Sequence, residues 1–172
     1  MARFYDKVVD VLAQVAVLLL LAIMIGIGLD VAARYLFNQP IGWMQEFVQH
    51  SLLYILFLGM PWLTREGGHV SIDMLVDALP IAGRRVLIGS GLLVAGLTSG
   101  FLASWAGIST VDNFQRGVET NGIYPIPRAW LIGVMALGLA LSAVEFLRRS
   151  YKIFGASDAD ILHRHGDLGA EP

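Results

Sequence analysis

The chain contains no cysteine, which excludes disulfide bonds, thiol redox chemistry and cysteine-bound metal ions. Charged residues are also scarce: they make up 15% of the 172 residues, and the formal net charge is −2. Nucleic-acid binding requires a basic surface, so this class of function is excluded as well. By contrast, 56% of the residues are hydrophobic, more than in an ordinary soluble domain. This composition indicates a protein that lies largely within a lipid bilayer.

The first long apolar segment identifies a membrane span. No charged residue occurs from Val11 to Leu29, and Gln14 is its single polar side chain. Nineteen residues of α-helix cover roughly the 30 Å thickness of the hydrocarbon core. A signal peptide would have an apolar region of only about 7–15 residues, followed by a small-residue cleavage site. Here the run is longer and ends at Asp30, which favours a permanent anchor.

Three further apolar segments predict an all-α integral membrane protein with four transmembrane helices. The expected spans are about 11–33, 46–64, 86–111 and 129–147. Together they form a single membrane domain over residues 1–154. Residues 155–172 are expected to be a loosely ordered tail. Tryptophan lies near the span ends, as at Trp43, which is typical of side chains at the headgroup level.

The lysine and arginine residues predict the orientation. With four spans, one side of the membrane holds both termini and the middle loop, and the other side holds the two shorter connections. The first side carries nine of the twelve basic residues, namely Arg3, Lys7, Arg65, Arg84, Arg85, Arg148, Arg149, Lys152 and Arg164. The second carries Arg34, Arg116 and Arg128. Because cytoplasmic loops are rich in Lys and Arg, we expect both termini in the cytoplasm.

The middle loop contains an amphipathic segment. From His69 to Leu79, polar residues recur every four positions at His69, Asp73 and Asp77, with apolar residues between them. This periodicity predicts a short helix at the cytoplasmic interface. Such a helix would either lie flat on the membrane or fold over the ends of the spans. Its acidic polar face disfavours anionic lipid, so we expect contact with protein.

His50 is a candidate because a histidine inside a span is a functional residue by default. Haem ligation, a proton relay and a substrate contact are the functional interpretations. Bis-histidine haem would need a second histidine at membrane depth, whereas His69, His163 and His165 fall in segments expected to be cytoplasmic. A neutral histidine that bonds a neighbouring helix or the headgroups is the simpler interpretation.

Small residues spaced four apart occur in the last two spans. Gly96 and Gly100 form a G-x-x-x-G motif, and Gly138 and Ser142 have the same spacing. Such strips allow another helix to approach closely. Docking of a partner subunit and packing among the four spans both fit this pattern, and the sequence does not separate them.

Charged residues at the span ends suggest three local pairs. Glu145 is three residues before Arg148 and four before Arg149, and Asp30 is four residues before Arg34. Residues at these spacings meet on a helix surface. We also expect Arg34 to reach Glu46 across the turn that joins the first two spans.

No part of the sequence resembles a nucleophile with its base, a metal cluster or a phosphate-binding loop. The spans also carry too few polar residues to form a solute path of their own. We therefore expect a non-enzymatic helper subunit that holds no cofactor.

The segment from Arg34 to Asp73 resembles the small membrane subunit of tripartite ATP-independent periplasmic (TRAP) transporters, the DctQ-like family. An Arg-aromatic-x-Phe segment closes the first span, and a Trp and a Glu open the second. A Gly lies within the second span, and a basic-x-x-x-His-Val-x-Ile-Asp segment follows it. The matching positions are Arg34, Tyr35, Phe37, Trp43, Glu46, Gly59, Arg65, His69, Val70, Ile72 and Asp73. Gln45 and Pro61 depart from the expected pattern.

The resemblance implies a subunit of a secondary transporter in the bacterial inner membrane. A periplasmic substrate-binding protein would deliver an organic acid to a large multi-span permease subunit. That large subunit would hold the substrate and sodium sites, while this chain would act as a scaffold in the lipid bilayer. The competing interpretation is a haem- or quinone-binding membrane anchor of a respiratory oxidoreductase. An assembly factor without a transport role is a third.

Overall fold

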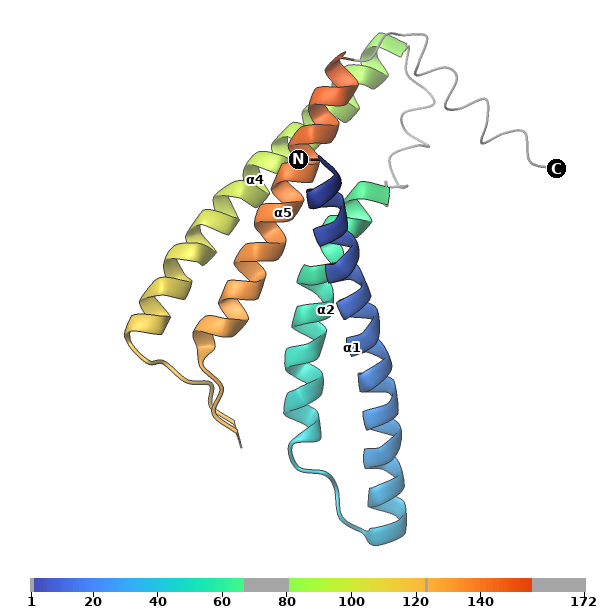
Figure 1. The fold of residues 1–172 in the computed structure, drawn as a ribbon, viewed down its shortest axis with the longest axis vertical. Coiled ribbons are helices and arrows are strands. Elements are labelled where there is room, and N and C mark those ends of the chain that lie inside the picture. Colours follow the sequence, from blue (N-terminus) through green and yellow to red (C-terminus); the bar gives the residue numbers. More distant parts are fainter. Residues whose placement is uncertain (1, 67–80, 123, 156–172) are drawn as a thin grey trace, which may run out of the picture.

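The computed structural model describes residues 2–66, 81–122 and 124–155 and consists of four long helices (Figure 1). They are α1 (Ala2–Phe37), α2 (Met44–Glu66), α4 (Ile81–Gln115) and α5 (Arg128–Gly155). All four are long and apolar enough to cross a membrane, and each expected span lies inside one of them. The all-α fold with four transmembrane helices is therefore confirmed. The amphipathic segment 69–79 and the tail lie outside the described residues.

The helices run alternately up and down. The start of α1, the end of α2, the start of α4 and the end of α5 lie toward one end of the molecule, here called the terminal end (Figure 1). The α1–α2 and α4–α5 connections lie at the opposite end, here called the loop end. This arrangement places the start of α1 and the end of α5 at the same end of the molecule (Figure 1).

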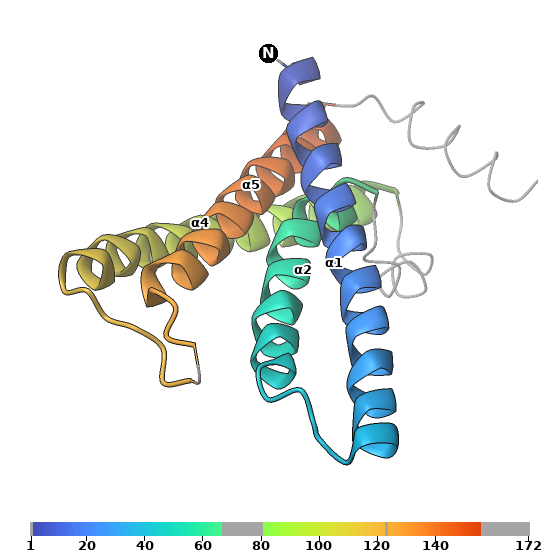
Figure 2. The ribbon, with the colours of Figure 1, turned by 60° about the horizontal axis from the view of Figure 1, so that its bottom comes forward.

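The four helices form an open arrangement and not a closed bundle. Extensive packing joins α1 to α2, α2 to α5 and α5 to α4. The α1–α2 and α4–α5 hairpins approach each other toward the terminal end and splay apart toward the loop end (Figures 1 and 2). Helices α1 and α4 therefore form the two outer edges, and α5 lies between α2 and α4.

Helix α1 contacts the rest of the chain along one narrow stripe. Val9, Ala16 and Ile23 are 1%, 6% and 5% exposed, whereas Leu18 and Ile25 are 64% and 65% exposed. The buried residues recur every seven positions, which is the spacing of one face of a helix in left-handed, coiled-coil-like packing. Most of the surface of α1 is thus open to lipid or to another subunit.

Helix α4 packs on α5 through small residues. A Cβ atom added at Gly96 would lie 3.0 Å from Leu147, and one at Gly100 would lie 3.8 Å from Ala143. The hydroxyl of Ser150 also donates a hydrogen bond to the carbonyl of Gly89 at 2.9 Å. The G-x-x-x-G strip therefore packs inside this chain, and of the two interpretations above the geometry matches packing among the spans.

The crossing of α5 over α2 depends on a glycine and a proline. A Cβ atom at Gly138 would overlap the carbonyl oxygen of Phe57. That carbonyl lacks its helical donor, because the residue four positions later is Pro61, which has no N–H. Gly138 brings the backbone of α5 against this oxygen, where a Cα–H group is a weak donor. Ser142, one turn further along α5, is completely buried.

Candidate functional site

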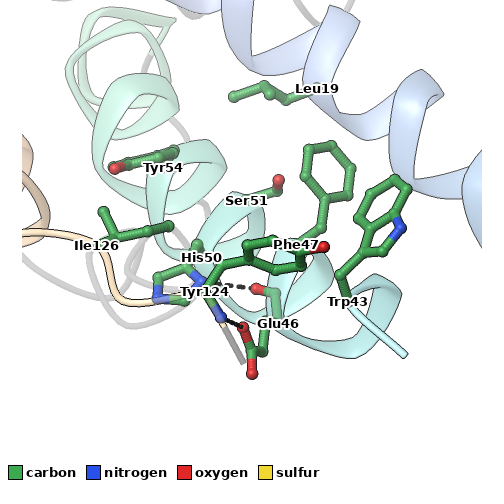
Figure 3. Close-up of a pocket in the computed structure, with 9 residues that line it drawn as sticks. All are labelled: Leu19, Trp43, Glu46, Phe47, His50, Ser51, Tyr54, Tyr124 and Ile126. Atoms are coloured by element: carbon green, nitrogen blue, oxygen red, sulfur yellow. Dashed lines mark hydrogen bonds between the residues drawn. The ribbon is translucent and has the colours of Figure 1, made fainter. Parts of the chain in front are cut away.

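A cavity opens at the loop end, on the side of α2 that faces the α4–α5 connection (Figure 3). Its volume is about 460 Å³, within the range of about 300–1,000 Å³ that is usual for ligand pockets. Most of its lining comes from one face of the first three turns of α2. The lining residues are Leu19, Trp43, Glu46, Phe47, His50, Ser51, Tyr54, Tyr124 and Ile126.

The α4–α5 connection is ordered by its own hydrogen bonds. The backbone N–H of Arg128 donates to the carbonyl of Val118 at 2.9 Å, and that of Thr120 donates to the carbonyl of Ile126 at 2.9 Å. The hydroxyl oxygen of Thr120 accepts a further bond from the N–H of Ile126 at 3.1 Å. These bonds close a short hairpin-like loop, which carries Tyr124 and Ile126 to the cavity.

Glu46 attaches this loop to the first turns of α2. Its carboxylate accepts a hydrogen bond from the backbone N–H of Tyr124 at 3.3 Å. A Cβ atom at Gly122 would lie 2.8 Å from the same carboxylate, so a glycine at that position lets the loop approach closely. The contact joins residues that are 78 positions apart and bridges the two hairpins at the end where they splay.

The expected pair between Arg34 and Glu46 is wrong. Arg34 instead binds Asp30, one turn earlier on α1, with 3.0 Å between the nitrogen and oxygen atoms. The other carboxylate oxygen of Asp30 accepts the backbone N–H of Ile41 at 2.7 Å. Asp30 thus lies next to Arg34 and also orders the α1–α2 turn, whereas Glu46 faces the α4–α5 loop. The predicted pair of Asp30 and Arg34 is confirmed.

His50 bonds within its own helix. Its Nδ1 atom lies 2.6 Å from the carbonyl oxygen of Glu46. A carbonyl only accepts hydrogen bonds, so Nδ1 carries the proton. His50 is also one of the residues that line the cavity (Figure 3). Among residues 2–66, 81–122 and 124–155, His50 is the single histidine, and no group of three or more His, Asp or Glu side chains is placed to hold a metal ion.

Trp43 forms the outer rim of the cavity. It is 48% exposed, and its ring meets Phe47 edge to face, with the ring centroids 6.1 Å apart. An amphipathic indole at the end of a span is well suited to the interface between headgroups and hydrocarbon.

A second polar group lies at the terminal end and joins three helices. We call it the ion-pair cluster, and it consists of Asp6, Asp10, Arg65, Glu145, Arg148 and Arg149. Arg65, at the end of α2, binds the carboxylate of Asp10 and donates to the carbonyl of Asp6 at 3.4 Å. Arg149 of α5 donates to the backbone carbonyl of Arg65. The last turn of α2 is thus tied to α1 on one side and to α5 on the other.

The most buried charge in the cluster is Glu145, which is 7% exposed. Arg148 lies 3.6 Å from its carboxylate and 3.8 Å from that of Asp6. The same guanidinium lies over the ring of Tyr5 at 5.0 Å, and the Tyr5 hydroxyl donates to the carbonyl of Leu141 at 2.9 Å. A buried carboxylate without a cation nearby costs several kcal/mol, so Arg148 is the necessary companion of Glu145.

Part of this cluster was predicted from the sequence. Glu145 was paired with Arg148 and Arg149; the structure places Arg148 next to it, whereas Arg149 donates to the carbonyl of Arg65. No role was predicted for Asp6 or Asp10. The available signal was their position: acidic residues on the first turns of α1 meet the basic last turn of an antiparallel α2. His69 and Asp73, the remaining candidates, lie outside the described residues.

Comparison with known proteins identifies the family. Residues 23–155 match the family described as "Tripartite ATP-independent periplasmic transporters, DctQ component". The chain belongs to the DctQ family. It is therefore a small permease subunit of the TRAP transporter type and a multi-pass protein of the inner membrane. The match does not favour the respiratory anchor.

Relatives of this DctQ chain are named as small permease proteins of TRAP transporters. A "Putative TRAP transporter small permease protein" of Haemophilus influenzae is 32% identical over 87 residues, covering 51% of this chain and 52% of the relative. A second protein of that name and organism is 22% identical over 87 residues. The "Ectoine TRAP transporter small permease protein TeaB" of Halomonas elongata is 24% identical over 131 residues, covering 75% of this chain and 66% of the relative. The matches span about half the length of the Haemophilus proteins.

Two charged residues of the DctQ-like segment, Glu46 and Arg65, lie at opposite ends of α2. Glu46, at the loop end, contacts the connection between α4 and α5. Arg65, at the terminal end, contacts α1. Each fixes one end of α2 to a part of the chain outside that helix. In this subunit the two residues position helices through these contacts.

Proposed function

We propose that this chain is the scaffold subunit of a TRAP transporter that imports an organic acid together with sodium. The large multi-span permease subunit carries the substrate and sodium sites, and a periplasmic binding protein delivers the acid. This chain holds no cofactor and widens the contact of the complex with the bilayer. Membership of the DctQ family supports the proposal, and the openness of the fold is the observation that carries it.

The open arrangement leaves its two edge helices, α1 and α4, available for contact with another subunit or with lipid. The buried residues of helix α1 are one every seven positions from Val9 to Ile23, and α4 exposes a row of large apolar side chains that includes Phe101, Trp105 and Ile108, at 68%, 66% and 68%. Inside a bilayer, such faces pack equally well against lipid and against the helices of another subunit. A chain with so much side surface is suited to join a larger membrane protein to the surrounding lipid.

The terminal end faces the cytoplasm in this proposal, because most lysine and arginine residues lie there. The loop end then faces the periplasm, where the binding protein docks. In the ion-pair cluster, Arg149 and Arg148 of α5 hold the two hairpins together on the inner side. The contact of Glu46 with Tyr124 joins them on the outer side.

Co-purification tests the complex directly. The chain carrying an affinity tag is expressed together with the large permease subunit, extracted in mild detergent and analysed by size-exclusion chromatography. We expect one peak that contains both subunits in equal amounts. A tagged chain that elutes alone, although both subunits are present in the membrane, would contradict the scaffold role.

A further inference from the structure

The cavity at the loop end reaches the middle of the membrane at Tyr54. This residue lies eleven positions after Trp43 and eleven before Arg65, which mark the two ends of α2. Each interval is about 16 Å of helix, so Tyr54 lies close to the centre of a hydrocarbon core that is about 30 Å thick. Its side chain is half-buried and lines the cavity. The cavity therefore contains a tyrosine hydroxyl at the depth where a bilayer is least polar.

This hydroxyl has no hydrogen-bond partner within the part of the chain that the structure describes. Hydroxyls on shorter side chains bond to their own helix: those of Thr64 and Thr98 donate to the carbonyl four residues earlier at 2.9 and 2.8 Å. A tyrosine hydroxyl lies at the far end of a rigid ring and needs a second helix. Tyr5 of α1 has one, because its hydroxyl donates to the carbonyl of Leu141 on α5 at 2.9 Å.

The neighbouring helix has moved away from α2 at the level of Tyr54. Helix α5 crosses α2 where Gly138 meets Phe57, and the two hairpins splay apart toward the loop end (Figures 1 and 2). Tyr54 lies three residues before Phe57, on the same side of α2. Its hydroxyl points away from Leu19 of α1 (Figure 3). The hydroxyl thus faces the opening between the hairpins.

The depth of Tyr54 determines what can accept its hydrogen bond. Lipid offers only hydrocarbon at the centre of a bilayer, where an unpaired hydroxyl is costly. A water molecule needs roughly two to four polar partners, whereas the cavity lining around Tyr54 is largely apolar, as at Leu19 and Ile126. A membrane helix of another subunit can present a carbonyl or a polar side chain at this depth.

We propose that the large permease subunit covers the opening between the two hairpins and that one of its membrane helices accepts a hydrogen bond from Tyr54. The acceptor is a backbone carbonyl or the side chain of Ser, Thr, Asn or Gln. This inference rests on the proposed function, because it requires the large subunit as the partner. It adds the place of contact, which is the side of α2 that α5 leaves uncovered.

The change Tyr54→Phe tests this contact, because it removes one hydroxyl group and keeps the ring. The chain is labelled on a single cysteine introduced at Ser157, since it has none of its own, and is titrated with the large permease subunit in mild detergent. Fluorescence anisotropy gives the Kd. We expect Tyr54→Phe to raise the Kd about threefold to tenfold, as for the loss of one hydrogen bond between membrane helices. The unfolding of the chain alone by SDS should stay unchanged.

Tyr5→Phe is the matched control, because the Tyr5 hydroxyl has its partner inside the chain. It should lower the stability of the chain alone and leave the Kd unchanged. An unchanged Kd for Tyr54→Phe would overturn the proposal, and so would a loss of stability of the isolated Tyr54→Phe chain. The hydroxyl would then bond to water or within this chain. Absence of binding by the unsubstituted chain would refute the proposed function, and this proposal with it.

Discussion

Arg65 at the end of α2 binds the carboxylate of Asp10 on α1, while its own backbone carbonyl accepts a hydrogen bond from Arg149 of α5. One residue therefore connects the outer helix α1 with the central helix α5. Next to it, Arg148 of α5 contacts Asp6 and Tyr5 of α1 directly, and the Tyr5 hydroxyl donates to the carbonyl of Leu141, so the link between α1 and α5 is concentrated at this end of the molecule. The stability of the arrangement should depend strongly on this position.

Replacing Arg65 with Met should destabilise the subunit. The Arg65 side chain is 23% exposed and that of Asp10 is 49% exposed, so the pair lies between a surface pair and a buried one, and we expect a loss of about 1–2 kcal/mol. Arg116→Met is the matched control, because Arg116 and its partner Asp112 are 70% and 52% exposed. Unfolding by SDS in mixed micelles, followed by circular dichroism, gives both values. Equal effects of the two changes would refute the importance of Arg65.

Gly138→Ala should also destabilise the chain, by about 1–3 kcal/mol as for other overpacked sites. The new methyl group would overlap the backbone carbonyl of Phe57, which has little freedom to move. Gly107→Ala is the control, since a Cβ atom there would meet nothing within 4 Å, and alanine favours the helix. The same unfolding assay compares them. If Gly138→Ala is as stable as the control, α5 does not cross α2 as described.

A double-mutant cycle distinguishes the two partners considered for Arg34. The coupling energy between Arg34 and Asp30 should be measurable but below about 1 kcal/mol, since the Arg34 side chain is 62% exposed. The coupling between Arg34 and Glu46 should be zero within error. Alanine substitutions and the unfolding assay suffice. A larger coupling energy of Arg34 with Glu46 than with Asp30 would show that Arg34 pairs with Glu46, as predicted from the sequence, and would contradict the structure.

The orientation can be tested with introduced cysteines, because the chain has none of its own. Single cysteines at Ser71, Asn121 and Ser157 are exposed to a membrane-impermeant thiol reagent on intact spheroplasts. We expect labelling at position 121 only, since the basic residues assign the other two positions to the cytoplasm. Labelling of position 71 or 157 from outside would reverse the orientation.

The position of each helix along the chain could be predicted from the sequence. Which helices pack against each other could not. Hydropathy and length determine a span almost alone, so each expected span lies within one helix. The spatial order α1, α2, α5, α4 depends instead on fine steric fit, such as Gly138 against Phe57. Lipid and protein offer similar surroundings to an apolar face, so the pattern of apolar residues carries little information about which helix packs on which.

At the polar sites, too, the residues could be predicted from the sequence but their partners could not. Trp43, Glu46 and His50 were recognised from the sequence, and the structure brings all three to one cavity. The partner of Glu46 could not be predicted, because its donor is a backbone N–H of a loop that folds through its own hydrogen bonds. Arg34 was nearer in sequence and oppositely charged, but it binds Asp30 one turn away.

The most direct test of the scaffold role is sodium-driven uptake in proteoliposomes of defined composition. The acid is chosen by its thermal stabilisation of the purified binding protein, and the uptake of its radiolabelled form is then measured. We expect uptake only when this chain, the large permease subunit and the binding protein are all present with an inward sodium gradient. Liposomes with this chain alone should take up no more than empty ones. Uptake by this chain alone, or full uptake without it, would contradict the account.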